Sequence, residues 1–231
     1  MAAPDEGPND DAERARGNAA LLDAAAAGDT DRVTALLDEG ADVAHANEWG
    51  FDALGSALWE SRLDTASVLV ERGAPVDLDA AAALGDVAAI SARWDAATPV
   101  EDTIGAYLGA CRSGQVEVIR WFLANGVPVD LHPPGEEWGG IGSPGLHHAA
   151  VNGHAPAVRL LLASGADVTL VDDVHGSQAL AWAAGAGHAD VVGLLLEAGA
   201  DPRHRNLHGR SASGLALDNG FGDLAATIDA A

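Results

Sequence analysis

The chain is poor in several residues that stabilise or identify small domains. Its 231 residues include one cysteine, Cys111, and no lysine, and aromatic residues make up only 4%. A single cysteine excludes an internal disulfide framework and is expected of a protein in the reducing cytoplasm. No apolar run reaches the ~18 residues that cross a bilayer. Residues 1–18 lack the basic and apolar regions of a secretory signal, so we expect a cytoplasmic protein.

Cationic side chains are also scarce. Twelve Lys and Arg residues face 35 Asp and Glu, which gives a net charge of −23 at pH 7. A field of this sign repels phosphate backbones and anionic lipids. It argues against nucleic acid and membrane partners and favours a protein partner with a cationic surface. A GC-rich genome and adaptation to high salt are two explanations of this composition, and the sequence leaves both open.

What the chain does contain is a repeated pattern of glycine, alanine and leucine. The stretch GHAPAVRLLLASGAD from Gly153 has close counterparts in GDTDRVTALLDEGAD from Gly28 and GHADVVGLLLEAGAD from Gly187. Weaker copies bring the number of units to seven. These seven units are anchored at Gly28, Ser61, Gly85, Gly114, Gly153, Gly187 and Gly220. Self-similarity at about 33 residues is the signature of a repeat architecture.

Each unit predicts a helix, a turn, a second helix and a loop. The alanine-rich segment before an anchor, such as residues 146–150, favours a short helix that can approach its neighbours closely. The anchor glycine can adopt the left-handed conformation that ends this helix. The following segment, such as residues 191–196, is apolar on too many sides for a surface helix. We therefore expect it to be buried between adjacent units.

These motifs resemble the ankyrin repeat family. The family signature T-P-L-H-x-A-A is matched loosely by residues 144–150. The G-H-x-x-x-V-x-L-L-L-x-x-G-A-D-V run is matched closely at residues 153–168 and, up to its aspartate, at residues 187–201. The resemblance implies a single all-α solenoid of about seven helix-turn-helix repeats over residues 11–231, after a disordered acidic tail over residues 1–10. It also implies a protein-binding module in which a β-hairpin-like loop, called a finger, projects from each helix pair. The inner helices and the fingers form a concave binding face.

The third unit is the least regular. It is about nine residues shorter than the period of such repeats. Asp77 runs almost directly into its first helix, so we expect its finger to be missing and the unit to be reduced. An insertion of about six residues precedes the fifth unit and displays Glu136, Glu137 and Trp138. This loop and the missing finger predict a pocket, which is the alternative binding site. The other possibility is that the loop packs on the surface and fills the gap.

Large side chains at outward positions are candidate binding anchors in a chain with so few aromatic residues. In the family's register Trp49 and Phe51 lie on a finger, and Trp59 lies near the end of an inner helix. Packing against the third unit is the alternative for the two tryptophans. With the residues around the predicted pocket, the partner-binding set is Trp49, Phe51, Trp59, Tyr107, Arg112, Glu136, Glu137 and Trp138.

The sequence shows no catalytic, cofactor or metal motif. The resemblance implies that His147, His154 and His188 form structural hydrogen bonds near helix ends. His148 directly follows His147, and adjacent residues of a helix face different directions. Cys111 occupies an alanine position, so we expect a buried residue rather than a nucleophile. We therefore expect protein binding without catalysis, cofactor or metal. The alternative is a small-molecule binder or an unusual enzyme that uses the pocket at the third unit.

Overall fold

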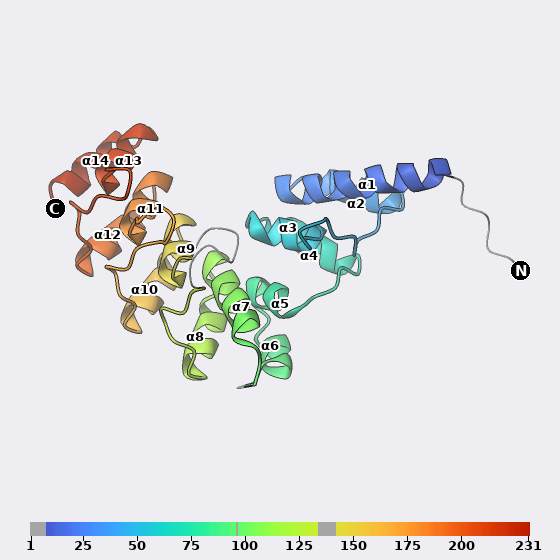
Figure 1. Ribbon diagram of the computed structural model, residues 1–231, viewed down its shortest axis with the longest axis horizontal. Coiled ribbons are helices and arrows are strands. Elements are labelled where there is room, and N and C mark those ends of the chain that lie inside the picture. The colour runs from blue at the N-terminus through green and yellow to red at the C-terminus, as the bar shows by residue number, and fades with distance from the viewer. Residues whose placement is uncertain (1–7, 96, 134–141) are drawn as a thin grey trace, which may run out of the picture. The chain divides into compact units, whose positions relative to one another are not determined.

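The computed structural model describes residues 8–95, 97–133 and 142–231, which form helices joined by turns and loops (Figure 1). This part of the chain contains fourteen helices, which follow one another as seven helix-turn-helix pairs. They are α1 (Pro8–Ala27), α2 (Thr30–Asp38), α3 (Ala53–Trp59), α4 (Leu63–Glu71), α5 (Leu78–Leu84), α6 (Val87–Arg93), α7 (Val100–Arg112), α8 (Val116–Ala124), α9 (Gly145–Val151), α10 (Ala155–Ala163), α11 (Ala179–Ala186), α12 (Ala189–Glu197), α13 (Ala212–Asp218) and α14 (Gly222–Asp229). The predicted all-α solenoid of about seven repeats is confirmed.

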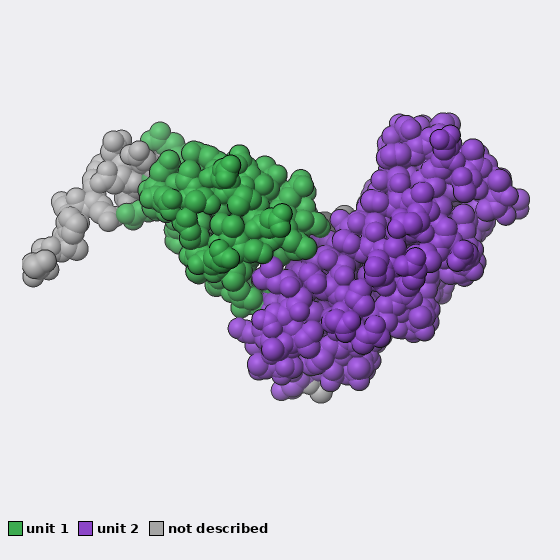
Figure 2. All heavy atoms as spheres, turned by 180° about the vertical axis from the view of Figure 1, so that it is seen from behind, with its two compact units in different colours: residues 1–80 green, residues 81–231 purple. Residues whose placement is uncertain are grey.

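The chain divides by its internal contacts into two compact units, residues 1–80 and residues 81–231 (Figure 2). In unit 1 the inner helices α1 and α3 pack together, as do the outer helices α2 and α4. In unit 2 the inner helix α9 packs between α7 and α11, α11 packs on α13, and the outer helix α10 packs on α8 and α12. The single domain from residue 11 and the disordered tail before it stay predictions, and α1 begins at Pro8.

Glycine is required at the anchor positions that end the inner helices for two reasons. Gly114 and Gly153 have φ of 69° and 72°, in the left-handed region where a Cβ is strained. Each glycine also lies under a side chain of the following repeat. A Cβ on Gly114 would lie 2.6 Å from the ring of His154, and a Cβ on Gly153 would lie 2.6 Å from the ring of His188. The glycine therefore allows the chain to turn and leaves space for the histidine ring of the following repeat.

The residues that follow the anchors Gly114, Gly153 and Gly187 also reach back to the preceding repeat. The Nε2 atom of His154 donates to the carbonyl oxygen of Arg112 at 2.8 Å, and Gln115 Nε2 donates to the carbonyl of Ala83 at 2.8 Å. His188 makes the same bond one repeat later, at 2.9 Å. The last carbonyls of a helix have no donor within the helix, so these bonds satisfy them. The prediction that His154 and His188 are structural is confirmed.

The third repeat is reduced, as predicted. Its outer helix α6 has seven residues, whereas the outer helices α4, α8, α10 and α12 have nine. Helix α4 ends at Glu71 and α5 begins at Leu78, whereas α10 ends at Ala163 and α11 begins only at Ala179. The connector before α5 is too short to form a finger of the kind that precedes α11.

Candidate functional site

The connector between α2 and α3 presents aromatic side chains to solvent. The Oδ1 atom of Asn47 accepts the backbone N–H groups of Trp49 and Phe51, both at 3.0 Å. Asn47 N in turn donates to the carbonyl of Phe51 at 2.9 Å, and Gly50 has φ of 83° at the tip of the turn. This closed turn leaves the Trp49 side chain outward, and the residue is 75% exposed.

Phe51 and Trp59 lie against each other beside this turn. Their rings meet edge to face, with centroids 5.9 Å apart and planes at 77°. They remain 39% and 49% exposed, so the pairing does not bury either residue. Asp52 positions them, because its carboxylate accepts Gly55 N at 2.7 Å and caps the helix that ends at Trp59. We call Trp49, Phe51 and Trp59 the aromatic patch.

The chain around the aromatic patch is acidic. Glu48 precedes Trp49, Asp52 follows Phe51 and Glu60 follows Trp59. Glu48 and Glu60 are exposed. Residues 33–61 contain no arginine or lysine. The patch therefore combines exposed apolar surface with negative charge.

Tyr107 was expected at the binding surface, but it lies in the core of unit 2. The residue is 0% exposed, and its hydroxyl donates to the carbonyl of Val129 at 2.7 Å. Its ring meets Phe122 edge to face at 6.1 Å. A tyrosine in this position stabilises the repeat and cannot contact a partner, so Tyr107 is not part of the proposed binding surface.

Arg112 ends α7 and is half-buried. Its carbonyl oxygen accepts the bond from His154. Glu136, Glu137 and Trp138 lie outside the described residues. The pocket expected at the third repeat depends on them and stays a prediction.

The titratable residues that are buried on the inner helices α7 and α9 include Cys111, His147 and His148. Burial raises the pKa of the Cys111 thiol, which keeps it protonated and unlike an activated nucleophile. Burial lowers the pKa of His147 to about 4 and that of His148 to about 3. His147 Nε2 donates to the carbonyl of Ser177 at 3.0 Å, and both imidazoles meet the ring of Trp182 edge to face. Within the described parts of the chain, no three His, Cys, Asp or Glu residues are grouped as a metal site requires.

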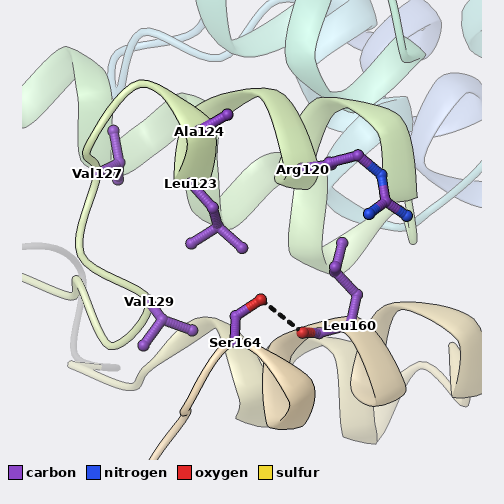
Figure 3. A pocket seen from close by; sticks show the side chains of 7 residues that line it. All are labelled: Arg120, Leu123, Ala124, Val127, Val129, Leu160 and Ser164. Carbon is purple, nitrogen blue, oxygen red and sulfur yellow. Dashed lines mark hydrogen bonds between the residues drawn. The ribbon is translucent and has the colours of Figure 1, made fainter.

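A shallow hollow of about 460 Å³ lies between the outer helices α8 and α10 (Figure 3). It is lined by Arg120, Leu123, Ala124, Val127, Val129, Leu160 and Ser164. The hollow is widely open to solvent. The hydroxyl of Ser164 already donates to the carbonyl of Leu160 at 2.8 Å, and the guanidinium of Arg120 forms an ion pair with Glu117 at 3.5 Å. A ligand site needs several converging polar groups in an enclosed cavity, and this groove between outer helices has neither property.

The regular repeats of unit 2 correspond to a known family. Residues 108–206 match the model of ankyrin repeats in three copies. This segment runs from the end of α7 through α12 and holds the glycine and histidine contacts described above. It is an array of ankyrin repeats, which are protein–protein interaction modules, and the resemblance noted in the sequence is confirmed.

Among characterised proteins, the chain is similar to palmitoyltransferase ZDHHC13 of Mus musculus, Homo sapiens and Pongo abelii. Each match is 30% identical over 83 residues, which is 36% of this chain. The chain spans only 12% of the length of these relatives. A match to so small a part does not bring the transferase activity to this protein. None of the described helices is long and apolar enough to cross a membrane.

Proposed function

We propose that the protein is an interaction module that binds a partner protein through the aromatic patch of unit 1. The observation that carries this proposal is the exposure of Trp49, Phe51 and Trp59, at 75%, 39% and 49%, in a chain with 4% aromatic residues. Large apolar side chains that remain exposed together are typical of binding surfaces. Two of these residues belong to a finger and one to an inner helix, the elements that form the concave face of ankyrin repeats.

The patch is suited to binding because its backbone is already ordered. Asn47 closes the turn that carries Trp49 and Phe51, and Asp52 caps the helix that carries Trp59. A preorganised surface loses less conformational entropy when a partner binds. Full burial of a large aromatic side chain removes ~150–250 Å² from water, and each Å² contributes ~25 cal/mol. Trp49 offers most of this area to a partner, whereas Phe51 and Trp59 offer the part of their surface that is still exposed.

The charge around the patch suggests the chemistry of the partner. Glu48 and Glu60 flank the aromatic residues, and the whole chain carries −23. Complementary charge at the rim of an interface increases the association rate and excludes partners of the same sign. We therefore propose a partner protein with an apolar pocket surrounded by lysine or arginine.

The proposal is tested by the combined change Trp49→Ala, Phe51→Ala and Trp59→Ala. The wild-type protein is used to isolate partners from its host, and a purified partner is then titrated by calorimetry. We expect a loss of at least ~2 kcal/mol, or about thirtyfold in Kd, because anchors of this kind dominate interfaces. Leu217→Ala is the matched control, because Leu217 is an exposed apolar residue of α13. Equal affinity of the triple variant and the wild type would reject the aromatic patch as the binding surface.

A further inference from the structure

The last two fingers of unit 2 form a second exposed surface. The first finger joins α10 to α11 and is closed by an antiparallel bridge between Val171 and Gln178. The second joins α12 to α13 and is closed by a bridge between Arg205 and Ser211. We call residues 202–211 the basic finger. Its charge differs from that of the rest of the chain.

The two fingers are locked together at their tips. Leu207 N donates to the carbonyl of His175 at 2.8 Å, and His204 Nε2 donates to the carbonyl of Gly176 at 2.8 Å. The rings of His175 and His208 lie 5.9 Å apart. The Leu207 side chain also covers Gly176, where a Cβ would approach it to 3.0 Å. The two tips therefore behave as one ordered surface rather than as separate loops.

Exposure alternates along the basic finger. His204 and Asn206 are partly buried and bond to the preceding finger, whereas Arg203, Arg205 and Leu207 are exposed. Arg205 lies in the bridge, and Arg203 and Leu207 lie in the turns on either side of it. The outward side thus presents two guanidinium groups followed by an apolar side chain. Leu207 is 74% exposed.

Further apolar surface comes from the preceding finger. Val171 and Val174 are 38% and 39% exposed, and His175 and His208 are exposed beside them. Together with Leu207 these residues offer area that a partner can bury.

The charge of the basic finger is unusual for this protein. Residues 202–217 contain Arg203, Arg205 and Arg210 and no aspartate or glutamate, in a chain with 35 acidic residues. Arg210 is neutralised by an ion pair with Asp218. Arg203 and Arg205 have no carboxylate partner among the described residues. Of the nearest acids, Asp172 is buried, whereas Asp173 and Asp201 are exposed, and Asp201 accepts the backbone N–H of Arg203 at 2.9 Å.

We propose that the basic finger and the tip before it bind an acidic segment of a partner protein, which places carboxylates on Arg203 and Arg205 and an apolar side chain against Leu207 and Val174. Charge complementarity selects this occupant. Guanidinium groups form strong charge-assisted bonds with carboxylates. The −23 of the whole chain opposes a polyanion such as RNA, which would extend over the acidic surface. At 0.15 M salt the Debye length is about 8 Å, so a short peptide experiences mainly the charges that it contacts.

The test uses a fluorescein-labelled peptide of alternating glutamate and leucine, titrated with the full chain at 0.15 M salt and followed by fluorescence anisotropy. We expect saturable binding, and weaker binding when glutamine replaces glutamate in the peptide. The change Arg203→Glu with Arg205→Glu should weaken binding at least about tenfold, because it replaces attraction with repulsion. Leu207→Ser should also weaken it. Circular dichroism confirms the fold of each variant, and Arg203→Gln with Arg205→Gln gives a milder change of the same sign.

Matched controls separate local recognition from the overall charge. Arg93→Glu with Arg159→Glu makes the same change of charge at exposed positions on α6 and α10 and should leave binding within about twofold. The triple variant of the aromatic patch should bind the peptide normally, so this proposal and the proposed function can fail independently.

Several outcomes would overturn the proposal. One is the absence of saturable peptide binding. Another is an equal loss of peptide affinity in the variant Arg203→Glu with Arg205→Glu and in the control Arg93→Glu with Arg159→Glu. Tighter binding of a single-stranded oligouridylate would assign the surface to nucleic acid. Sedimentation of the protein alone could instead reveal a dimer that requires Arg203 and Arg205, which would assign the surface to a second copy of the chain.

Discussion

His154 is bound to Arg112 across the boundary between two repeats. Its Nε2 donates to the Arg112 carbonyl at 2.8 Å, and its ring occupies the space that a side chain on Gly114 would need. Because a carbonyl oxygen only accepts, this bond fixes the neutral tautomer with the proton on Nε2. Burial lowers the pKa of His154, although its bond to Arg112 raises it. The contact links the repeat that contains His154 to the repeat before it.

The first prediction compares two glycines of the same repeat. Gly153 and Gly165 both have positive φ, 72° and 89°, but only Gly153 lies under a neighbouring ring. Gly165→Ala should cost ~1–2 kcal/mol of unfolding free energy from backbone strain alone. Gly153→Ala should cost at least ~1 kcal/mol more, because it also displaces His188. Urea unfolding of both variants measures the difference, and equal costs would show that the ring contact contributes nothing.

The second prediction concerns the buried histidines of α9. Burial lowers the pKa of His147 to about 4 and that of His148 to about 3, whereas an unfolded histidine titrates near 6.5. Below pH 6.5 the unfolded state binds more protons than the folded state, so stability falls as the pH falls. Each of the two histidines should lower the free energy of unfolding by about 2 kcal/mol at pH 5.

Urea unfolding at pH 7.5 and pH 5 measures this dependence. The variant His147→Asn with His148→Asn should have a smaller difference in stability between the two pH values, even if it is less stable at both. His208→Asn, on the exposed tip of the basic finger, is the matched control and should keep the wild-type difference. A double variant with an unchanged pH dependence would contradict the prediction.

The third prediction concerns Asp172, which is buried at the base of a finger. Its carboxylate accepts Ser177 N at 3.0 Å, Val174 N at 3.1 Å and Trp182 Nε1 at 3.1 Å. Burial raises its pKa, but the hydrogen bonds from His175 N, Trp182 Nε1 and Ser177 N and the nearby His175 ring lower it by more, so the net shift is downward. The stability that it contributes is therefore present above pH ~4 and is lost below it.

Asp172→Asn should destabilise the protein by ~1–3 kcal/mol at pH 7, because the amide replaces one acceptor with a donor facing other donors. Asp229→Asn is the control, since Asp229 is exposed on α14. Thermal unfolding compares the two variants. If both melt like the wild type, the carboxylate does not hold the finger.

The fourth prediction concerns net charge. With −23 on 231 residues, mutual repulsion should weaken the fold at low ionic strength. Salt near 0.1 M reduces the Debye length to ~10 Å and screens most of this repulsion. The Tm should therefore rise up to that concentration and then level off. A Tm that is flat or falls over this range refutes the prediction, and a rise that continues to molar salt indicates adaptation to high salt.

Local features of the fold could be predicted from the sequence. The anchor glycines, the alanine-rich inner helices and the bonding histidines each depend on neighbours at a fixed offset in the repeat. The position of Tyr107 was missed although a signal existed. Tyr107 precedes Cys111 by four residues, so the two share a helix face. Because Cys111 occupies a buried alanine position, that face had to be buried as well.

The basic finger was missed for a different reason. A net charge of −23 describes the average of the chain and hides a stretch, residues 202–217, without a single acidic residue. The alternating exposure of Arg203, Arg205 and Leu207 depends on bonds between two fingers, and hydrophobic periodicity does not reveal such bonds. The meeting of Phe51 and Trp59 likewise depends on the turn closed by Asn47.

The fit between an anchor glycine and the next repeat has a consequence for how such a chain evolves. Gly153 receives the ring of His188, and Gly187 receives the ring of Phe221. Removal of residues 154–187 would place the ring of Phe221 over Gly153. This joint between repeats would be the same contact that Phe221 already makes with Gly187. Whole repeats can therefore be lost or duplicated by recombination without inventing a new contact, whereas a shift of one residue would break every joint that it crosses.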